Sequence, residues 1–268
     1  MTKLPAISIC LAVSLGCAFN APSRVESSST DLQGPLDLAE FRIEVGSLTI
    51  VGSDTEQTVL DKEIHWADDG RPQVSEEIDD GILQVVSECP SGTATTSCRV
   101  DFVVALPSDT EVSIELGDGA LEVEGILGAV TATVGLGDAK LSAIGGGVHL
   151  VNSYGDAVLS RVTGDLYLDV ASGVVLSSGL RSNDVLVSTT WGRQELDFTQ
   201  LGGTLSTTSK EGGIQITLPD GTYDVAALSD FGQVDVSVEQ DPDAEGKVVA
   251  ASVSGDVEVS YGVEEDTQ

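Results

Sequence analysis

Residues 41–54, with the sequence FRIEVGSLTIVGSD, decide the fold. Apolar and polar residues alternate from Phe41 to Val45, a glycine follows at Gly46, and the alternation resumes from Leu48 to Ile50. Alternation with a period of two is typical of a β-strand that buries one face. The stretch therefore predicts a strand, a glycine turn and a second strand.

The same pattern returns around a series of glycines spaced 18–23 residues apart: Gly117, Gly137, Gly155, Gly173, Gly192, Gly212, Gly232 and Gly255. A unit of two short strands cannot bury its apolar face alone, but stacked units bury it between their neighbours. We therefore predict an all-β fold, a single-stranded parallel β-solenoid (β-helix-like) of about 18–20 residues per coil. An antiparallel β-sandwich with short hairpins is the alternative.

The repeats occupy residues 111–262, which form the predicted solenoid. Residues 39–110 contain longer strands and acidic stretches such as residues 75–80, and we predict that they form an N-terminal β cap contiguous with the solenoid. A cap is expected because a bare terminal coil exposes an unpaired strand edge. Residues 263–268 are interpreted as an acidic tail.

The N-terminus has the pattern of an export signal. Residues 1–17 combine a basic start, an apolar run from Leu4 to Leu15 that is too short to span a bilayer, and a lipobox-like Ser-Leu-Gly before Cys17. We predict a signal peptide and lipidation of Cys17, hence a cell-envelope lipoprotein at the outer membrane or cell surface. Ordinary cleavage nearby, giving a periplasmic or secreted protein, is the alternative. Residues 18–38, with their Ser, Pro and Gly, predict a flexible tether.

Two cysteines remain once the signal and the lipidated residue are set aside. Cys89 and Cys98 lie close together in the sequence ECPSGTATTSCRV. In an oxidising compartment such a pair predicts a disulfide that closes a loop between two strands. A metal site is not favoured, because no neighbouring Cys or His supplies further ligands.

The charge balance limits the partners. The chain has 44 acidic and 12 basic residues, a formal net charge of −32. Such a surface repels phosphates and anionic headgroups, so we expect no nucleic acid partner and membrane contact only through the lipid anchor. We interpret the acidic charge as an adaptation for solubility in a salty environment. The alternative, more specific interpretation is that the carboxylates attract calcium.

Two columns of residues are candidate sites. Asp118, Asp138 and Asp156 each follow a corner glycine in consecutive repeats and could stack as a calcium ladder, or serve simply as turn residues. Tyr154, Trp191 and Phe231 each precede such a glycine and could form a ridge that stacks on sugar rings, or pack at the corners. No other cofactor is indicated.

No catalytic motif is found. The chain has no G-x-S-x-G elbow, no phosphate-binding loop and no dinucleotide fingerprint, and its two histidines, His65 and His149, are interpreted as structural. We predict a non-enzymatic adhesin-like binding or structural module whose partner is a glycan or an envelope protein. The alternatives are a lyase-like enzyme acting on envelope polysaccharide and a purely structural spacer.

Three stretches carry a family resemblance: FRIEVGSLTIVGSD, VDFVVALPSDTEVSIELGDGALEVEGILG and VNSYGDAVLSRVTGDLYLDV. Over about residues 41–261 the chain resembles the bacterial exported β-helical domains named "putative adhesins", largely a domain of unknown function. The resemblance implies a parallel β-helix-like fold and a cell-envelope location, and it brings no set of catalytic residues.

Overall fold

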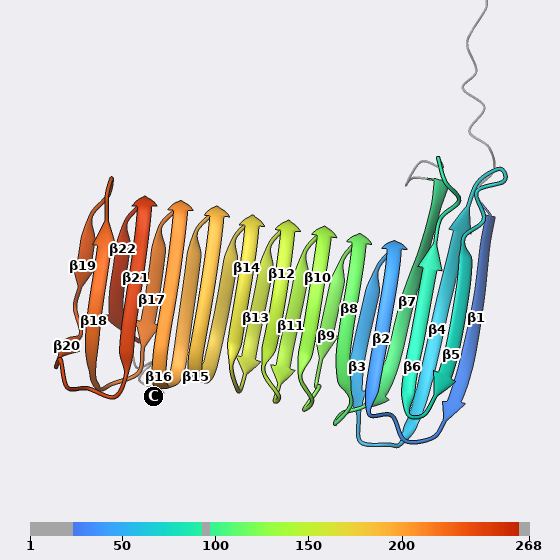
Figure 1. The fold of residues 1–268 in the computed structure, drawn as a ribbon, viewed down its shortest axis with the longest axis horizontal. Coiled ribbons are helices and arrows are strands. Elements are labelled where there is room, and N and C mark those ends of the chain that lie inside the picture. Colours follow the sequence, from blue (N-terminus) through green and yellow to red (C-terminus); the bar gives the residue numbers. More distant parts are fainter. Residues whose placement is uncertain (1–23, 93–96, 263–268) are drawn as a thin grey trace, which may run out of the picture.

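The computed structural model describes residues 24–92 and 97–262, which are built almost entirely of β-strands (Figure 1). Within those ranges no helix has the length and apolar character needed to cross a membrane. The strands are β1 (Arg24–Gln33), β2 (Leu38–Val45), β3 (Leu48–Ser53), β4 (Gln57–Trp66), β5 (Gln73–Asp79), β6 (Ile82–Glu88), β7 (Cys98–Pro107), β8 (Glu111–Asp118), β9 (Leu121–Glu124), β10 (Val130–Leu136), β11 (Ala139–Ile144), β12 (Val148–Tyr154), β13 (Ala157–Val162), β14 (Leu166–Ser172), β15 (Val175–Trp191), β16 (Gln194–Glu211), β17 (Ile214–Leu218), β18 (Thr222–Ser229), β19 (Val234–Val236), β20 (Glu239–Gln240), β21 (Lys247–Ser254) and β22 (Val257–Tyr261).

The central strands stack as the coils of a parallel solenoid (Figure 1). β8, β10, β12 and β14 pair in parallel and form what we call the front sheet, while β9, β11 and β13 form the back sheet. β15 and β16 each run through both sheets, so each supplies one strand segment to either side. Residues 113, 131, 149 and 167 are in register, which confirms a repeat of 18 residues in these coils.

The core lies between the two sheets. Every second side chain points inward, and the inward columns are short aliphatic residues such as Leu150, Leu168 and Val187 in the front sheet and Leu141 and Leu159 in the back sheet, all fully buried. Burying such a side chain contributes about 1.5–3 kcal/mol. Aliphatic residues form most of this core, in keeping with the low aromatic content of 4%.

One column of glycines forms the corner between the front and back sheets. Its members have positive φ angles of 137–153°, and a Cβ built on any of them would lie 1.7–2.4 Å from the nearest backbone atom of the neighbouring coil: Gly119, Gly137, Gly155, Gly173, Gly192, Gly212 and Gly255. Only glycine permits this conformation and this approach. The sequence-based assignment of Gly117 to the column was wrong by two residues, because Gly117-Asp118-Gly119 offers two glycines and Gly119 is the one that stacks.

The N-terminal region is more than a cap. β2 and β3 form a regular coil that pairs directly with β8 and β9. β6 and β7 form a further coil on the outer side of that one, although they come later in the sequence. Antiparallel strands β5 and β4 then extend the two sheets outward.

The tether assigned to residues 18–38 was wrong for residues 24–33. These residues form β1, which pairs with β4 in antiparallel register over its whole length. The sequence of β1 has no alternating apolar pattern, so the strand could not be predicted from it. Its extended conformation is stabilised by backbone pairing with β4. Residues 1–23, with the predicted signal peptide, Cys17 and the start of the tether, and the tail 263–268 lie outside the described residues.

The C-terminal coils are also out of sequence order. β21 lies between β16 and β18 in the front sheet, and β22 lies between β17 and β19 in the back sheet. The chain therefore leaves a gap of one coil after β17, builds β18 and β19 beyond it, and returns to fill the gap with β21 and β22 (Figure 1).

Candidate functional site

The structure does not bring the three predicted calcium ligands into one ladder. Asp118 is in register with Val45 and Leu136, two residue positions before the column of Asp138 and Asp156. Asp138 Oδ1 accepts a hydrogen bond from the backbone N–H of Asp156 at 2.9 Å, and Asp156 Oδ1 accepts one from Val174 N–H at 2.8 Å. The described residues contain no group of three or more His, Cys, Asp or Glu side chains placed to hold a metal ion. The carboxylates of this column therefore act as turn residues that tie one coil to the next.

The predicted aromatic residues do share one column. Tyr154 and Trp191 both align with Ser172, which lies on the coil between them, so they are two coils and about 10 Å apart. Phe231 is at the same corner, but the inserted β21–β22 coil separates it further from Trp191 than the sequence predicted. Leu136, one coil before Tyr154, completes a column that we call the corner ridge: Leu136, Tyr154, Trp191 and Phe231.

The corner ridge is exposed, so its rings do not pack into the corners. Tyr154 is 60% exposed, Trp191 54% and Phe231 78%. The buried Asn152 supports the corner from inside, since its side-chain amide donates to the carbonyls of Gly137 at 3.1 Å and Gly155 at 3.2 Å. Asn152 thus fixes the backbone of the corner from the inside, and Tyr154 lies on the outside of the same corner.

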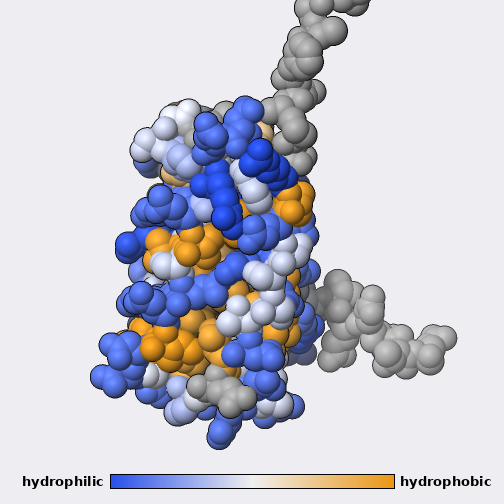
Figure 2. Space-filling view, turned by 90° about the vertical axis from the view of Figure 1, so that its right-hand side faces the viewer, coloured by the Kyte–Doolittle hydropathy of each residue, from blue (hydrophilic) through white to orange (hydrophobic). Residues whose placement is uncertain are grey.

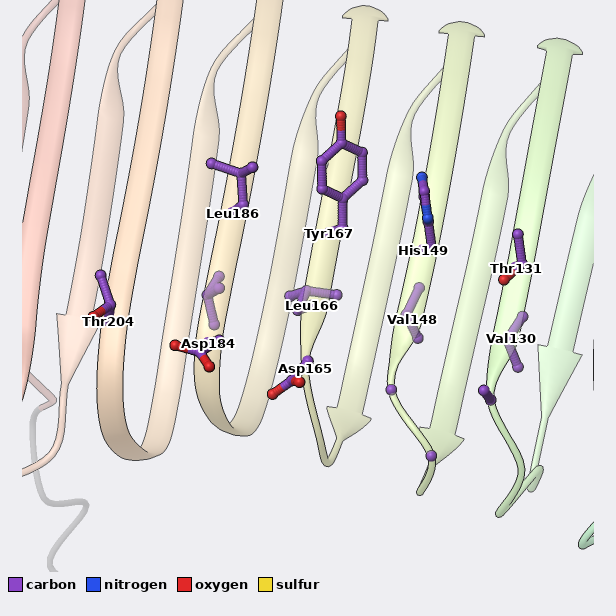
Figure 3. A pocket seen from close by; sticks show the side chains of 14 residues that line it. Val130, Thr131, Val148, His149, Asp165, Leu166, Tyr167, Asp184, Leu186 and Thr204 are labelled. Carbon is purple, nitrogen blue, oxygen red and sulfur yellow. The ribbon is translucent and has the colours of Figure 1, made fainter.

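A pocket of about 470 Å³ lies on the outer surface of the front sheet (Figure 3). Its floor is formed by outward residues of neighbouring coils, chiefly His149 of β12, Tyr167 of β14 and Leu186 of β15. The rings of His149 and Tyr167 lie side by side with centroids 4.4 Å apart. Asp165 and Asp184 stand at the end of the pocket where β14 and the front half of β15 begin. We call this the front-sheet pocket.

Sequence reasoning missed the front-sheet pocket. His149 was interpreted as an ordinary structural residue because its strand alternates, and alternation alone does not show what lies beside it. The available signal was the 18-residue register, which places Tyr167 directly next to His149 and Leu186 one coil further. Reading the outward positions of successive repeats as a column would have found the site.

A second cluster lies near the N-terminal end, around His65 of β4. His65 Nε2 is 2.7 Å from Glu63 Oε1 and 3.3 Å from Asp101 Oδ2. Asp101 Oδ1 also accepts hydrogen bonds from the backbone N–H and the hydroxyl of Ser47, both at 2.9 Å. Ser47 bonds to the carboxylate and not to the imidazole, so the arrangement is not that of a nucleophile activated by a base. It connects the turn before β3 with β4 and β7.

Several basic side chains are engaged by acidic neighbours. Lys140 Nζ is 2.6 Å from Glu122 Oε1, and this hydrogen bond, with the attraction of the carboxylate, raises the pKa of the Lys140 ammonium. Arg193 Nε is 2.7 Å from Glu195 Oε1. Both pairs are on the back sheet, whereas the front-sheet pocket is bordered by aspartates. A lyase acting on acidic sugars would need cations beside the aromatic floor, and the residues that line the pocket include no Lys or Arg.

Known proteins with a similar sequence pattern or fold agree with the architecture described above. The family model described as Toastrack DUF4097 matches residues 39–268. A "putative adhesin" from Bacteroides fragilis is 13% identical with a TM-score of 0.54, covering 88% of this chain and 97% of its own. A "putative adhesin" from Parabacteroides distasonis is 12% identical with a TM-score of 0.50, over the same shares of the two chains. These likenesses concern the fold. No curated protein matches the chain.

Proposed function

Because the chain belongs to the Toastrack DUF4097 family, we propose that it is a non-catalytic, adhesin-like binding module of the cell envelope whose ligand is a glycan held on the front sheet. The family description names no catalytic activity. Solved structures with this fold, from B. fragilis and P. distasonis, carry the name "putative adhesin". The front-sheet pocket supplies the chemistry that supports the proposal.

The observation that carries the proposal is the His149–Tyr167 ring pair with two aspartates at one end of the pocket. An aromatic face packs against the C–H groups of a pyranose ring, and carboxylates accept hydrogen bonds from its hydroxyls. Tyr167 is 38% exposed and forms the floor, while Asp165 and Asp184 are at one end. The acidic border disfavours anionic sugars, so a neutral or amino sugar fits best.

The corner ridge extends the same surface. Tyr154 ends β12, the strand that carries His149, and Trp191 ends β15, the strand that carries Leu186. Their rings are spaced at about 10 Å, about the length of two sugar units in an extended chain. We propose that a longer glycan contacts the front-sheet pocket and this ridge together, which would couple their affinities.

The experiment is a glycan array probed with the domain from residue 24, in calcium and again in chelator. We expect binding that is unchanged by chelator, because the described residues hold no candidate metal cluster. Tyr167→Ala should abolish the signal and Trp191→Ala should weaken it for longer glycans. Val158→Ala, an outward residue of the back sheet, is the matched control and should bind normally.

Silence on the array for the unmodified domain would reject the glycan proposal and favour a spacer or an envelope protein partner. Signal that survives Tyr167→Ala would move the ligand site away from the front-sheet pocket. Signal that is lost in chelator would show that a cation takes part, in conflict with the carboxylate arrangement described above.

We also propose that the module is exported and anchored through a lipid on Cys17. The lipobox-like segment ends at Cys17, and a disulfide joins Cys89 and Cys98, as expected in an oxidising compartment. Mass spectrometry of the N-terminus of protein from native membranes tests this. An acylated Cys17 at the new N-terminus supports it, and an unmodified Cys17 or cleavage elsewhere rejects it.

A further inference from the structure

Among the residues that the structure describes, strand β18 leaves one edge of the front sheet unpaired. Its residues Asp224–Ser229 pair with β21 on one side, and on the other side β20 covers only Thr222 and Tyr223. The N–H of Asp224 donates to Gly246 O and that of Asp230 donates to Ser252 O. Since backbone groups alternate along a strand, the N–H and C=O groups of Val225 and Ala227 point to the open side.

The open edge has few of the features that normally prevent strand pairing, since Asp224, at its start, is its one charged residue. Exposed edges are usually protected by charges, proline or a bulge. The opposite edge of the front sheet, β5, has such protection, because Glu76, Glu77 and Asp79 lie within it. Figure 2 views that N-terminal end and shows hydrophilic residues around and between several hydrophobic areas. By contrast, residues 225–229 of β18 read Val-Ala-Ala-Leu-Ser, with no charge, proline or glycine.

The side chains near the open edge are apolar and accessible. Val225 and Ala227 point toward the core but are only partly buried, because no further coil covers them. Leu228 is 60% exposed on the outer face, and Phe231 follows it at the corner. An added strand would bury apolar surface on both faces as well as form backbone hydrogen bonds.

The charge at this end selects the partner. Residues 219–247 contain eight acidic residues and one basic residue, Lys247, which is in register with Asp224 on the neighbouring strand. A second copy of this chain would bring eight further carboxylates against them, which disfavours pairing of two copies. A basic segment would be attracted instead.

We infer that the outer edge of β18 binds an extended basic segment of another protein by strand addition to the front sheet. Backbone hydrogen bonds from Val225 and Ala227 would supply the pairing, and the surrounding carboxylates would select Lys and Arg side chains. This site is on the terminal coil, apart from the front-sheet pocket, and does not depend on the glycan proposal.

A short synthetic peptide with alternating Lys and Val tests the inference, by fluorescence anisotropy with the domain from residue 24. We expect saturable binding that weakens with salt. The same peptide N-methylated at alternate residues keeps its charge but loses the donors of one edge, and it should bind at least about tenfold more weakly. Equal binding of the two peptides would overturn strand addition and leave only charge attraction.

Ala227→Pro provides the matching change in the protein. The Ala227 N–H has no strand partner among the described residues, so proline removes a donor at the open edge without breaking the pairing to β21. We expect an unchanged circular dichroism spectrum and at least about tenfold loss of peptide binding. Unchanged affinity in a folded Ala227→Pro variant would overturn the inference.

The charge requirement is tested separately. Asp230→Asn with Asp235→Asn should weaken binding of the basic peptide, whereas Glu77→Gln with Asp79→Asn removes the same charge at the far end and should not. An equal effect of the two double variants would show that net charge, and not this edge, attracts the peptide. Dimerisation of the peptide-free domain that Ala227→Pro abolishes would assign the edge to a second copy and overturn the inference.

Discussion

The carboxylate of Asp138 accepts a hydrogen bond from the backbone N–H of Asp156, on the next coil, at 2.9 Å. Asp156 repeats the contact toward Val174 N–H at 2.8 Å. Asp256 makes the same contact with Gln233 N–H near the C-terminal end, also at 2.8 Å. Aspartate after the corner glycine is therefore a device that joins coils.

Removing one of these carboxylates should lower stability without changing any metal response. We expect Asp138→Ala to lower the free energy of unfolding by about 1 kcal/mol, because an N–H of the next coil loses its acceptor. Urea unfolding measures this, and Asp118→Ala, two residue positions away from this column, is the control with a smaller effect. The Tm should be the same in calcium and in chelator for all three proteins, and a calcium-dependent rise that Asp138→Ala removes would contradict the turn role.

The glycine column should tolerate no side chain. A Cβ on Gly155 would lie 2.0 Å from Gly137 O, and its φ is 137°. We expect Gly155→Ala to cost about 2–5 kcal/mol from strain and overpacking. Gly262→Ala is the control, because a Cβ there would meet Thr217 Cγ2 at 3.5 Å, an ordinary contact. Thermal unfolding of the two variants side by side checks the difference, and equal Tm values would show that the coils can move apart.

The Cys89–Cys98 disulfide should stabilise the outer coil formed by β6 and β7. The two Cα atoms are 6.0 Å apart, and Cys98 is buried at the start of β7. Replacing both cysteines with Ala should lower the free energy of unfolding by about 2–3 kcal/mol in the chain-entropy description. A reductant should lower the Tm of the unmodified protein to that of the variant and leave the variant unchanged. A Tm that is insensitive to reductant would contradict this role.

Tyr223 should make the protein less stable at high pH. Burial, followed by repulsion from Tyr261 and Asp220, raises the pKa of its phenol above the ordinary 10.0, and the hydroxyl donates to Pro219 O at 2.8 Å. The folded state thus keeps this proton while the unfolded chain loses it near pH 10, so the contribution is complete below pH 10 and declines as the pH rises toward the folded pKa. Urea unfolding at pH 8 and pH 11 should show a smaller loss for Tyr223→Phe than for the unmodified protein. An equal loss would place the pH sensitivity elsewhere.

Local pattern was sufficient to predict the class of the fold. The alternation in residues 41–54 and the recurring glycines define two strands per coil and a period near 18, because side-chain direction in a strand and the backbone demands of a tight corner are local properties. For the same reason the column shared by Tyr154 and Trp191 could be predicted from their common position before a glycine.

Which coils are neighbours could be decided only by the tertiary structure. The strand pairs β2–β8 and β16–β21 join segments that are not consecutive coils in the sequence, and β1 is a strand through its pairing with β4 alone. The pattern of one strand does not specify its partner, because every coil presents a similar aliphatic edge. Gly119, and not Gly117, belongs to the corner column because it is Gly119 that stacks on Gly46 of the neighbouring coil. This contact between coils also fixes the position of Asp118.

The front-sheet pocket and the open edge of β18 arise at that same level. His149 and Tyr167 are 18 residues apart, and only the stacking of β12 on β14 brings their rings to 4.4 Å. β18 has a sequence that would suit an interior strand. It is an edge strand because β21 inserts between β16 and β18 and does not pair on the outer side of β18. The sequence by itself determined the shape of one coil, and the order in which coils stack decided which surfaces remain open to partners.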